Sequence, residues 1–378
     1  MTVATTAPLP AFRHWRALLS ADGRDDAALA APWLHDGDRP LWFSRGAWAL
    51  RCAADGMAGA LRRPPRVWLP DYFCNQTVSP LRQAGVVPVF YPIDEALRPD
   101  WNDCAALAAG DGPPDLFVLV HFFGYPAVPD EARQFCDSHG ATMVEDAAHV
   151  LAPSGRIGSA GDLVLYSQYK HLPIPDGGLL VLRPSAGPLA DAAVRAARPL
   201  SHAAPACGKW MAKRLLQIAV PALAADLGRG ATLAFGDDPE PSPLPATGAM
   251  SGAARRMLAT MRGELAAVAA RRKENAEALY RALSAAQGLR PLFPAGRGDA
   301  VPYRAVFRAA DRATAERWYD LFHTAGQVVE TWPDLAPEIR AAPDRHRAAI
   351  ALRDTVLALP VNADRTPEEL VEAYGKAL

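Results

Sequence analysis

Short apolar stretches alternate with helical patterns through the first half of the chain, and this alternation restricts the fold more than any other feature. Each stretch is apolar on both faces and is bounded by Gly, Pro or Asp, which is typical of parallel strands covered by helices on both sides. We predict strands at residues 66–69, 87–93, 116–122, 142–145, 163–166 and 178–182. Helices are expected at residues 47–61, 74–83, 101–108 and 130–138. The pattern therefore predicts an α/β fold with a mostly parallel central sheet and helices on both faces.

The remainder of the chain has a different organisation. Too few residues separate the last two predicted strands for a crossover helix, so we expect those strands to be antiparallel. Residues 186–250 are expected to form a helical bridge that ends in a proline-rich loop at 237–247. Beyond it we predict a long helix at 251–285, a strand at 303–307, a helix at 313–325 and a last helix capped by Thr366.

These elements divide the chain into three parts. We predict a lead-in at 1–40 with a short helix near 11–19, a large domain at 41–250, and a long helix with a small α+β domain at 251–378. No sequence repeat of fixed period interrupts this division.

The composition excludes several classes of protein. Half of the 378 residues are hydrophobic, which argues against wholesale disorder, and the net charge of −1 argues against a general nucleic-acid binder. The five cysteines have no CxxC spacing, so we expect a reducing compartment rather than a disulfide framework or a zinc site. The first residues lack a basic flank followed by an apolar run, and no apolar stretch is long enough to span a bilayer. A cytoplasmic protein is therefore expected.

Two reactive groups follow predicted strands, where ligands collect in open α/β sheets. Asp146 comes at the end of strand 142–145, where a carboxylate can hold a cation, bind a sugar hydroxyl or keep a heterocyclic nitrogen protonated. The alternative is a helix cap or an ion pair. Lys170 follows strand 163–166 and is the only lysine in the first 208 residues. Burial there is expected to lower its pKa, as a Schiff-base lysine requires, whereas the alternative is a surface cation in a loop.

Further candidates lie near other strand ends. The stretch from Ser44 to Leu50 enters a helix, whose first N–H groups, at Gly46 and Ala47, can cradle a phosphate. The alternative is simple capping of the helix by Ser44. Tyr72 and Phe73 follow strand 66–69 and either stack on a flat ring or belong to the core.

Other motifs carry less weight. His121 is expected to be a buried histidine with its own partners rather than a site residue. The GxGxxG, P-loop, GxSxG and HExxH motifs are absent from the sequence.

Together these residues match the requirements of pyridoxal phosphate. The lysine binds the aldehyde, the carboxylate keeps the pyridine nitrogen protonated, the helix start holds the phosphate, and an aromatic side chain fixes the ring plane.

In these motifs the sequence resembles the pyridoxal-phosphate-dependent sugar aminotransferases of the DegT, DnrJ and StrS group. The similar stretches are "VWLPDYFCNQTVSPLRQAGVVPVFYPID", "LVHFFGYP", "VEDAAHVL", "GSAGDLVLYSQYKHLPIPDGGLLVL", "ARRKENAEALYRAL" and "LALPVNADRTPEEL". The resemblance implies fold type I, with an amino group moved from glutamate to a keto group on a nucleotide-linked sugar, in surface polysaccharide or amino-sugar biosynthesis. It also implies a homodimer with the active site at the interface.

The resemblance assigns roles to residues of this chain. Lys170 would be the Schiff-base lysine and proton shuttle, and Asp146 would pair with the pyridine nitrogen. His149 would contact the phenolic oxygen of the cofactor. Ser167 would bind the phosphate together with the backbone of Gly46 and Ala47. Glu145, which precedes Asp146, is expected to be structural.

The chain departs from the family pattern in three places. Cys74 stands where the family has its stacking aromatic, so Phe73 or Tyr72 would take that role. The short spacing from Ser167 to Lys170 resembles a subgroup with an "SxxK…PDGG" pattern. The Asn and Arg with which the family reaches the phosphate of its partner subunit are absent from residues 246–251.

These departures keep two alternatives open: a non-catalytic binding or assembly protein of the same fold, and a sugar dehydratase. A basic, apolar segment at 209–225 is expected to pack in the dimer, with a membrane surface as the alternative.

Overall fold

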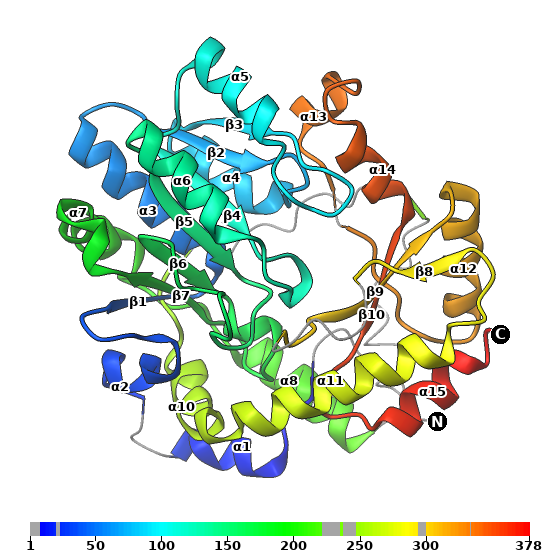
Figure 1. Ribbon diagram of the computed structural model, residues 1–378. Coiled ribbons are helices and arrows are strands. Elements are labelled where there is room, and N and C mark those ends of the chain that lie inside the picture. The colour runs from blue at the N-terminus through cyan, green and yellow to red at the C-terminus, as the bar shows by residue number, and fades with distance from the viewer. Residues whose placement is uncertain (1–7, 20–22, 221–234, 237–246, 294–299, 333) are drawn as a thin grey trace.

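The computed structural model describes residues 8–19, 23–220, 235–236, 247–293, 300–332 and 334–378 (Figure 1). A seven-stranded sheet forms its centre, in the order β1-β7-β6-β5-β4-β2-β3. The strands are β1 (Arg39–Phe43), β2 (Arg66–Pro70), β3 (Val87–Tyr91), β4 (Leu116–Val120), β5 (Thr142–Ala147), β6 (Leu163–Tyr166) and β7 (Gly178–Leu182).

The direction of the strands follows from the length of their connections. Strands β2 to β6 are mutually parallel, whereas β7 is antiparallel to both β6 and β1. Only a loop containing the 3-10 turn Gln168–Lys170 joins β6 to β7, so the chain reverses without a crossover. The predictions of a mostly parallel sheet and of an antiparallel last pair are confirmed.

Helices cover both faces of this sheet (Figure 1). On one side α5 (Trp101–Asp111) and α6 (Pro129–His139) meet through the rings of Trp101 and Phe135, whose centroids are 5.6 Å apart. Elsewhere α3 (Gly46–Leu61) packs against α4 (Asn75–Gln83) and α7 (Pro188–Leu200). The largest core cluster lies among these elements and includes Trp68 and Phe117.

The C-terminal part forms its own antiparallel sheet in the order β10-β9-β8. Its strands and helices are β8 (Leu289–Pro291), β9 (Arg304–Ala309), β10 (Val356–Pro360), α12 (Arg312–Thr324), α13 (Pro337–Ala341), α14 (Arg347–Thr355) and α15 (Pro367–Gly375). Thr366 caps α15 through a capping box with Glu369, which confirms the predicted start of this helix. The predicted α+β character of this part is also confirmed.

The prediction of one continuous helix at 251–285 is wrong. The chain instead forms α10 (Gly252–Met261) and α11 (Leu265–Ala282), separated by a 3-10 turn at Arg262–Glu264. Gly263 favours this interruption because glycine has a low helix propensity. The Glu264 carboxylate binds Arg13 at 2.8 Å, which ties the turn to the N-terminal helix α1 (Phe12–Arg16).

Some predictions from the sequence concern residues that the structure does not describe, or remain untested. Residues 237–246 of the predicted proline-rich loop lie outside the described residues, and the boundaries of the three predicted parts remain a prediction. The predicted basic, apolar segment forms α8 (Gly208–Ala219), which exposes Leu215 and Ile218 to solvent; residues 221–234 are not described. The helix α2 (Asp26–Ala30) lies beside α10 and β1.

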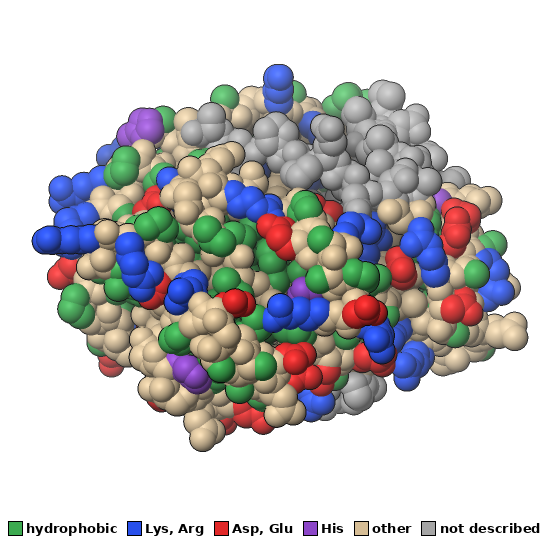
Figure 2. Space-filling model, turned by 90° about the horizontal axis from the view of Figure 1, so that it is seen from above, with side chains coloured by type: hydrophobic (Ala, Val, Ile, Leu, Met, Phe, Trp, Pro, Cys, Tyr) green, Lys and Arg blue, Asp and Glu red, His purple; other side chains and the backbone are tan. Residues whose placement is uncertain are grey.

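Contacts between the two parts place C-terminal residues next to the ends of β2 and β4. The Asp71 carboxylate, just after β2, lies 2.9 Å from Nδ1 of His346, and both side chains are buried. The N–H of Tyr303 donates to the carbonyl of Phe123 at 2.8 Å. Acidic and basic side chains are interspersed over the face shown in Figure 2, in keeping with the net charge of −1.

Candidate active site

A pocket of about 280 Å³ opens at the carboxyl ends of β4, β5 and β6, beside the starts of α3 and α4. This is the edge of an open α/β sheet at which ligands bind. Seven of the eight predicted site residues line it: Gly46, Ala47, Phe73, Asp146, His149, Ser167 and Lys170. Tyr72 lies outside the lining, in the core.

Lys170 ends the 3-10 turn after β6 and reaches the pocket from there. Burial opposes its positive charge, but the phenols of Tyr169 and Tyr303 and the carboxylate of Asp146 outweigh burial and raise the pKa of Lys170. The lowered pKa expected from the sequence is therefore wrong. The sequence places Lys170 after an apolar strand but does not indicate which polar groups surround its amine.

Asp146 lies at the end of β5, level with Val120 of β4 and Leu165 of β6. Among the described residues its carboxylate accepts one hydrogen bond, from the N–H of Ala148 at 2.9 Å. Burial raises the pKa of Asp146, while this N–H and the ammonium of Lys170 act in the opposite direction. A buried carboxylate with so few donors can accept a further one from a ligand.

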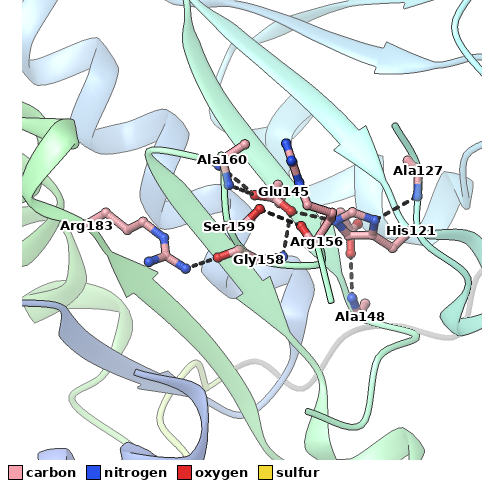
Figure 3. A network of polar contacts seen from close by, with 11 residues as sticks. His121, Ala127, Glu145, Ala148, Arg156, Gly158, Ser159, Ala160 and Arg183 are labelled. Carbon is pink, nitrogen blue, oxygen red and sulfur yellow. Dashed lines mark hydrogen bonds and ion pairs between the residues drawn. The ribbon is translucent and has the colours of Figure 1, made fainter. Parts of the chain in front are cut away.

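Glu145, the preceding residue, has a saturated environment (Figure 3). Its oxygens accept from the N–H groups of Gly158, Ala160 and Gly161 at 2.6–2.8 Å and lie 2.7 Å from Nε2 of His121. Burial alone would raise the pKa of Glu145, but these hydrogen bonds lower it. Its contacts are structural, as expected.

His121 is held on both sides of its ring. Nε2 contacts Glu145, and Nδ1 accepts the N–H of Ala127 at 3.1 Å. The ring is fully buried and is absent from the pocket lining. The expectation of a partnered core histidine is therefore confirmed.

The start of α3 forms one wall of the pocket, next to Ser167. A Cβ atom on Gly46 would lie 2.6 Å from Oγ of Ser167, so only glycine lets this hydroxyl approach the helix start. A Cβ on Gly178 of β7 would lie 2.5 Å from the carbonyl carbon of Arg45, so the strand packs equally closely on the same turn. The first N–H groups of α3, at Gly46 and Ala47, and the Ser167 hydroxyl thus meet at one point, where an anion would find several donors.

His149 contributes a neutral ring to the opposite wall. Burial and, after it, the positive charge of Lys170 lower the pKa of His149 well below its ordinary value, and Arg304 acts in the same direction. Its Nδ1 accepts the N–H of Phe123 at 3.2 Å, so the neutral ring carries its proton on Nε2. The ring stacks on Tyr303, with centroids 4.6 Å apart.

The aromatic residues divide between pocket and core. Phe73 and Cys74 line the pocket, whereas Tyr72 is fully buried and stacks on Trp332 with centroids 4.2 Å apart. Trp332 itself lines the pocket from the C-terminal part, and Tyr169 lines it from the turn after β6. Neither residue was expected at the site from the sequence. Trp332 reaches this edge only through the fold of the C-terminal part, and Tyr169 stands next to Lys170 without a motif of its own.

A comparison of the sequence with known protein families agrees with this geometry. The family described as the DegT/DnrJ/EryC1/StrS aminotransferase family matches residues 66–194, which include Asp146 and Lys170. Over these residues the chain is similar to that family. The recognition made from the motifs is therefore confirmed.

Two curated relatives match segments of 144 and 112 residues. GDP-perosamine synthase of Vibrio cholerae is 26% identical over 144 residues, which cover 36% of this chain and 38% of the relative. The spore coat polysaccharide biosynthesis protein SpsC of Bacillus subtilis is 33% identical over 112 residues, 28% of each chain. The matched segment therefore spans less than half the length of these curated relatives.

Solved aminotransferase structures are similar over nearly the whole chain. The aminotransferase TlmJ from Streptoalloteichus hindustanus has a TM-score of 0.72 at 20% identity, covering 99% of this chain and 97% of its own. PseC of Helicobacter pylori, an aminotransferase of pseudoaminic acid biosynthesis, has a TM-score of 0.71 at 12% identity, covering 100% and 98%. Spr1654 of Streptococcus pneumoniae, in its PLP form, has a TM-score of 0.71 at 14% identity and the same coverage. At such low identities, this structural similarity establishes the fold alone, which is fold type I.

The described residues fit pyridoxal phosphate. Because Gly46 has no side chain, the Ser167 hydroxyl lies close to the start of α3, and the donors that meet there suit a phosphate group. Asp146 retains acceptor capacity for a protonated ring nitrogen, and Lys170 brings an amine into the same pocket. No group of three or more His, Cys, Asp or Glu side chains in the described part of the chain is arranged to hold a metal ion. Nor does any helix in that part have the length and apolar character needed to cross a bilayer.

Proposed function

We propose that this protein is a pyridoxal-phosphate-dependent aminotransferase that moves an amino group from glutamate to a keto group on a nucleotide-linked sugar. The pathway class we propose is surface polysaccharide or amino-sugar biosynthesis. The observation that carries the proposal is one pocket in which Lys170, Asp146 and the start of α3 converge. The family match and the relatives named above support the same reaction class.

When bound, pyridoxal phosphate supplies an aldehyde that takes up an amino group and a protonated ring that withdraws electrons. Asp146 would hold the proton on the ring nitrogen, because its carboxylate has acceptor capacity and is shielded from water. Ser167 and the N–H groups of Gly46 and Ala47 would hold the phosphate. His149 would donate from Nε2 to the ring oxygen, and Phe73 would pack against the ring.

Lys170 carries two tasks in this proposal. Its Nζ would bind the aldehyde carbon of the cofactor and, after release, move a proton between the reacting carbon atoms. The raised pKa of Lys170 keeps the free amine protonated near neutral pH, so the amine must lose a proton before it attacks the aldehyde. Attachment of the cofactor is therefore expected to become faster as the pH rises.

The test uses the colour of the cofactor. Wild-type protein loaded with pyridoxal phosphate is expected to be yellow, to lose that absorbance with glutamate, and to regain it with a keto sugar. Borohydride reduction is expected to label the peptide that contains residue 170, and Lys170→Ala is expected to abolish that label. Lys213→Ala, on the exposed face of α8, is the matched control and is expected to keep it.

The outcomes separate the alternatives. A colour that glutamate leaves unchanged, with every keto sugar supplied, would contradict the aminotransferase and favour the binding protein of the same fold. Elimination of water from the sugar without amino transfer would indicate the dehydratase instead.

We also propose a homodimer with the active site at the interface, and a cytoplasmic location. The exposed Leu215 and Ile218 on α8 support a protein interface, since such a cluster is costly in water. The five cysteines are all free, which suits a reducing compartment. Light scattering is expected to give twice the 40.4 kDa of one chain, and a monomer at all concentrations would contradict the dimer.

A further inference from the structure

Arg45 carries the only guanidinium group among the described residues that line the pocket. It immediately precedes Gly46, and so stands at the start of α3 where the phosphate is proposed to bind. Its backbone is extended, and its side chain makes no capping hydrogen bond to the helix. The side chain is therefore not needed to begin the helix, and its placement requires another explanation.

Contacts with neutral groups hold this guanidinium in place. Its central carbon lies 4.3 Å from the centroid of the Tyr169 ring, and Tyr169 also lines the pocket. Nη1 donates to the carbonyls of Ser44 at 2.8 Å and of Pro175 at 3.3 Å. These contacts fix the plane of the guanidinium without neutralising it.

The other two nitrogens of the Arg45 guanidinium have free hydrogen-bond donors among the described residues. Nε and Nη2 make no hydrogen bond, and no carboxylate forms an ion pair with Arg45, among the described residues. Other arginines in this part of the fold are paired: Arg51 on α3 binds Asp55 at 2.7 Å. The buried carboxylate of Asp176 interacts with the charge of Arg45 but forms no direct ion pair with it. A half-buried guanidinium that is fixed and keeps free donors suits an anion that arrives from outside.

The charge requirement of the pocket points to the same residue. The N–H groups of Gly46 and Ala47 and the Ser167 hydroxyl supply hydrogen bonds but no full positive charge. Lys170 is committed to the aldehyde in the proposed function. A phosphate with nearly two negative charges needs a cation when it leaves water, because an uncompensated buried charge is strongly unfavourable.

We propose that Arg45 is the cation that recognises the phosphate group of pyridoxal phosphate in this chain, oriented over Tyr169 so that Nε and Nη2 bind the phosphate oxygens. This inference rests on the proposed function, since it concerns the same pocket. The protein then neutralises the phosphate with a residue of the subunit that also provides Lys170. Arg45 is thus a binding residue that selects the phosphorylated form of the cofactor.

The test compares two ligands that differ only by the phosphate. Full-length protein freed of cofactor is titrated with pyridoxal phosphate and with pyridoxal, and absorbance reports binding of each. Arg45→Gln is expected to weaken binding of pyridoxal phosphate by roughly 10- to 100-fold, the range of a charge-assisted hydrogen bond, and to leave pyridoxal binding unchanged. Inorganic phosphate is expected to compete with pyridoxal phosphate in wild-type protein and much less in the variant.

Two further variants guard against a purely structural effect. Arg45→Met keeps an apolar stem over Tyr169 without the charge, and is expected to lose the same selectivity as Arg45→Gln. Arg51→Gln, on the same helix but outside the pocket lining, is the matched control and is expected to keep it. Wild-type preference for the phosphorylated ligand in both Arg45 variants would overturn the inference, and so would equal weakening of both ligands. Wild-type protein that binds neither ligand would overturn the proposed function as well, so the two failures are distinguishable.

Discussion

Two neighbouring acids at the end of β5 each lie beside a histidine, Glu145 beside His121 from the end of β4 and Asp146 beside His149, and the two pairs are used differently. Glu145 and His121 form the packed side, where every carboxylate oxygen has donors. Asp146 and His149 form the pocket side, where the carboxylate accepts one N–H among the described residues. Successive residues of a strand point to opposite faces, so one peptide step separates a structural acid from a reactive one.

The pKa directions of the two acids follow from this difference. Both carboxylates are buried, and burial alone would raise the pKa of each. Hydrogen bonds to His121 and three amides reverse the direction at Glu145, whereas one amide and Lys170 do not reverse it at Asp146. The fold therefore stabilises the charge of Glu145 and leaves that of Asp146 to be stabilised by a bound cation.

Replacing Asp146 should separate activity from stability most clearly. We expect Asp146→Asn to slow the glutamate half-reaction by roughly 100- to 1000-fold, as expected for removal of a preorganised charge in a water-poor site. The raised pKa means that ionised Asp146 costs folding free energy above the ordinary aspartate pKa, so the neutral side chain should not lower stability. Single-turnover absorbance and thermal unfolding measure the two effects. A variant that unfolds more easily but reacts normally would reverse the roles assigned to the two sides.

The reciprocal change, Glu145→Gln, should act mainly on stability. An amide leaves part of the donor set of Gly158, Ala160, Gly161 and His121 without an acceptor inside the core. We expect the free energy of unfolding to fall by about 3 kcal/mol, measured by urea denaturation. Glu338→Gln is the control, since its half-exposed pair with Arg82 should contribute little. A fall in the free energy of unfolding of less than about 0.5 kcal/mol, which is the usual scatter of surface substitutions, would show that the packed side does not stabilise the fold.

The pH dependence of stability should tell the two acids apart further. The lowered pKa of Glu145 means that its contribution is complete above the ordinary glutamate pKa of about 4.3 and is lost as the pH falls through the lower folded value. The gap in unfolding free energy between wild type and Glu145→Gln should therefore be constant near neutral pH and shrink in acid. For Asp146→Asn we expect the opposite: the free energy of unfolding of wild type should rise relative to that of the variant as the pH falls, because wild type gains stability when Asp146 is protonated. Parallel curves for the two variants would remove the distinction.

Local sequence was sufficient for the strands of the central sheet that lead into the site. β6 and β7 have the predicted bounds, and β2 extends one residue beyond the prediction, because buried parallel strands are short apolar runs bounded by turn residues. β1, with Pro40 and an exposed start, and β8, with only three residues, lack that pattern and were not predicted. The break at Arg262–Glu264 was missed because Gly263 alone is a weak local signal and the partner of Glu264 comes from α1, far away in the sequence.

The site shows the same limit. Asp146 and Lys170 were found because each follows a predicted strand, and the start of α3 because a small, polar turn enters a helical pattern there; both are local signals. The raised pKa of Lys170 depends in part on Tyr303 and Asp146, and Trp332 comes from the C-terminal part, so the local pattern around Lys170 encodes neither feature in full. Tyr72 and Phe73 were equivalent by sequence; the fold separates them by placing one in the core and the other in the pocket lining.

The smallest effect is expected at His149, the neutral member of the pocket side. Its pKa is lowered well below the ordinary value by burial and nearby cations, so the ring should stay uncharged from pH 6 to 8 and add no step to the pH profile of the glutamate half-reaction. Glutamine can offer an N–H in place of Nε2, so His149→Gln should slow that reaction by no more than about tenfold, the lower end for loss of one positioned donor. Stopped-flow absorbance across this pH range checks both statements. A wild-type rate that changes with a pKa near 6.5, and becomes independent of pH in His149→Gln, would mean that the ring is protonated during the reaction; the pocket side would then carry a second titrating group.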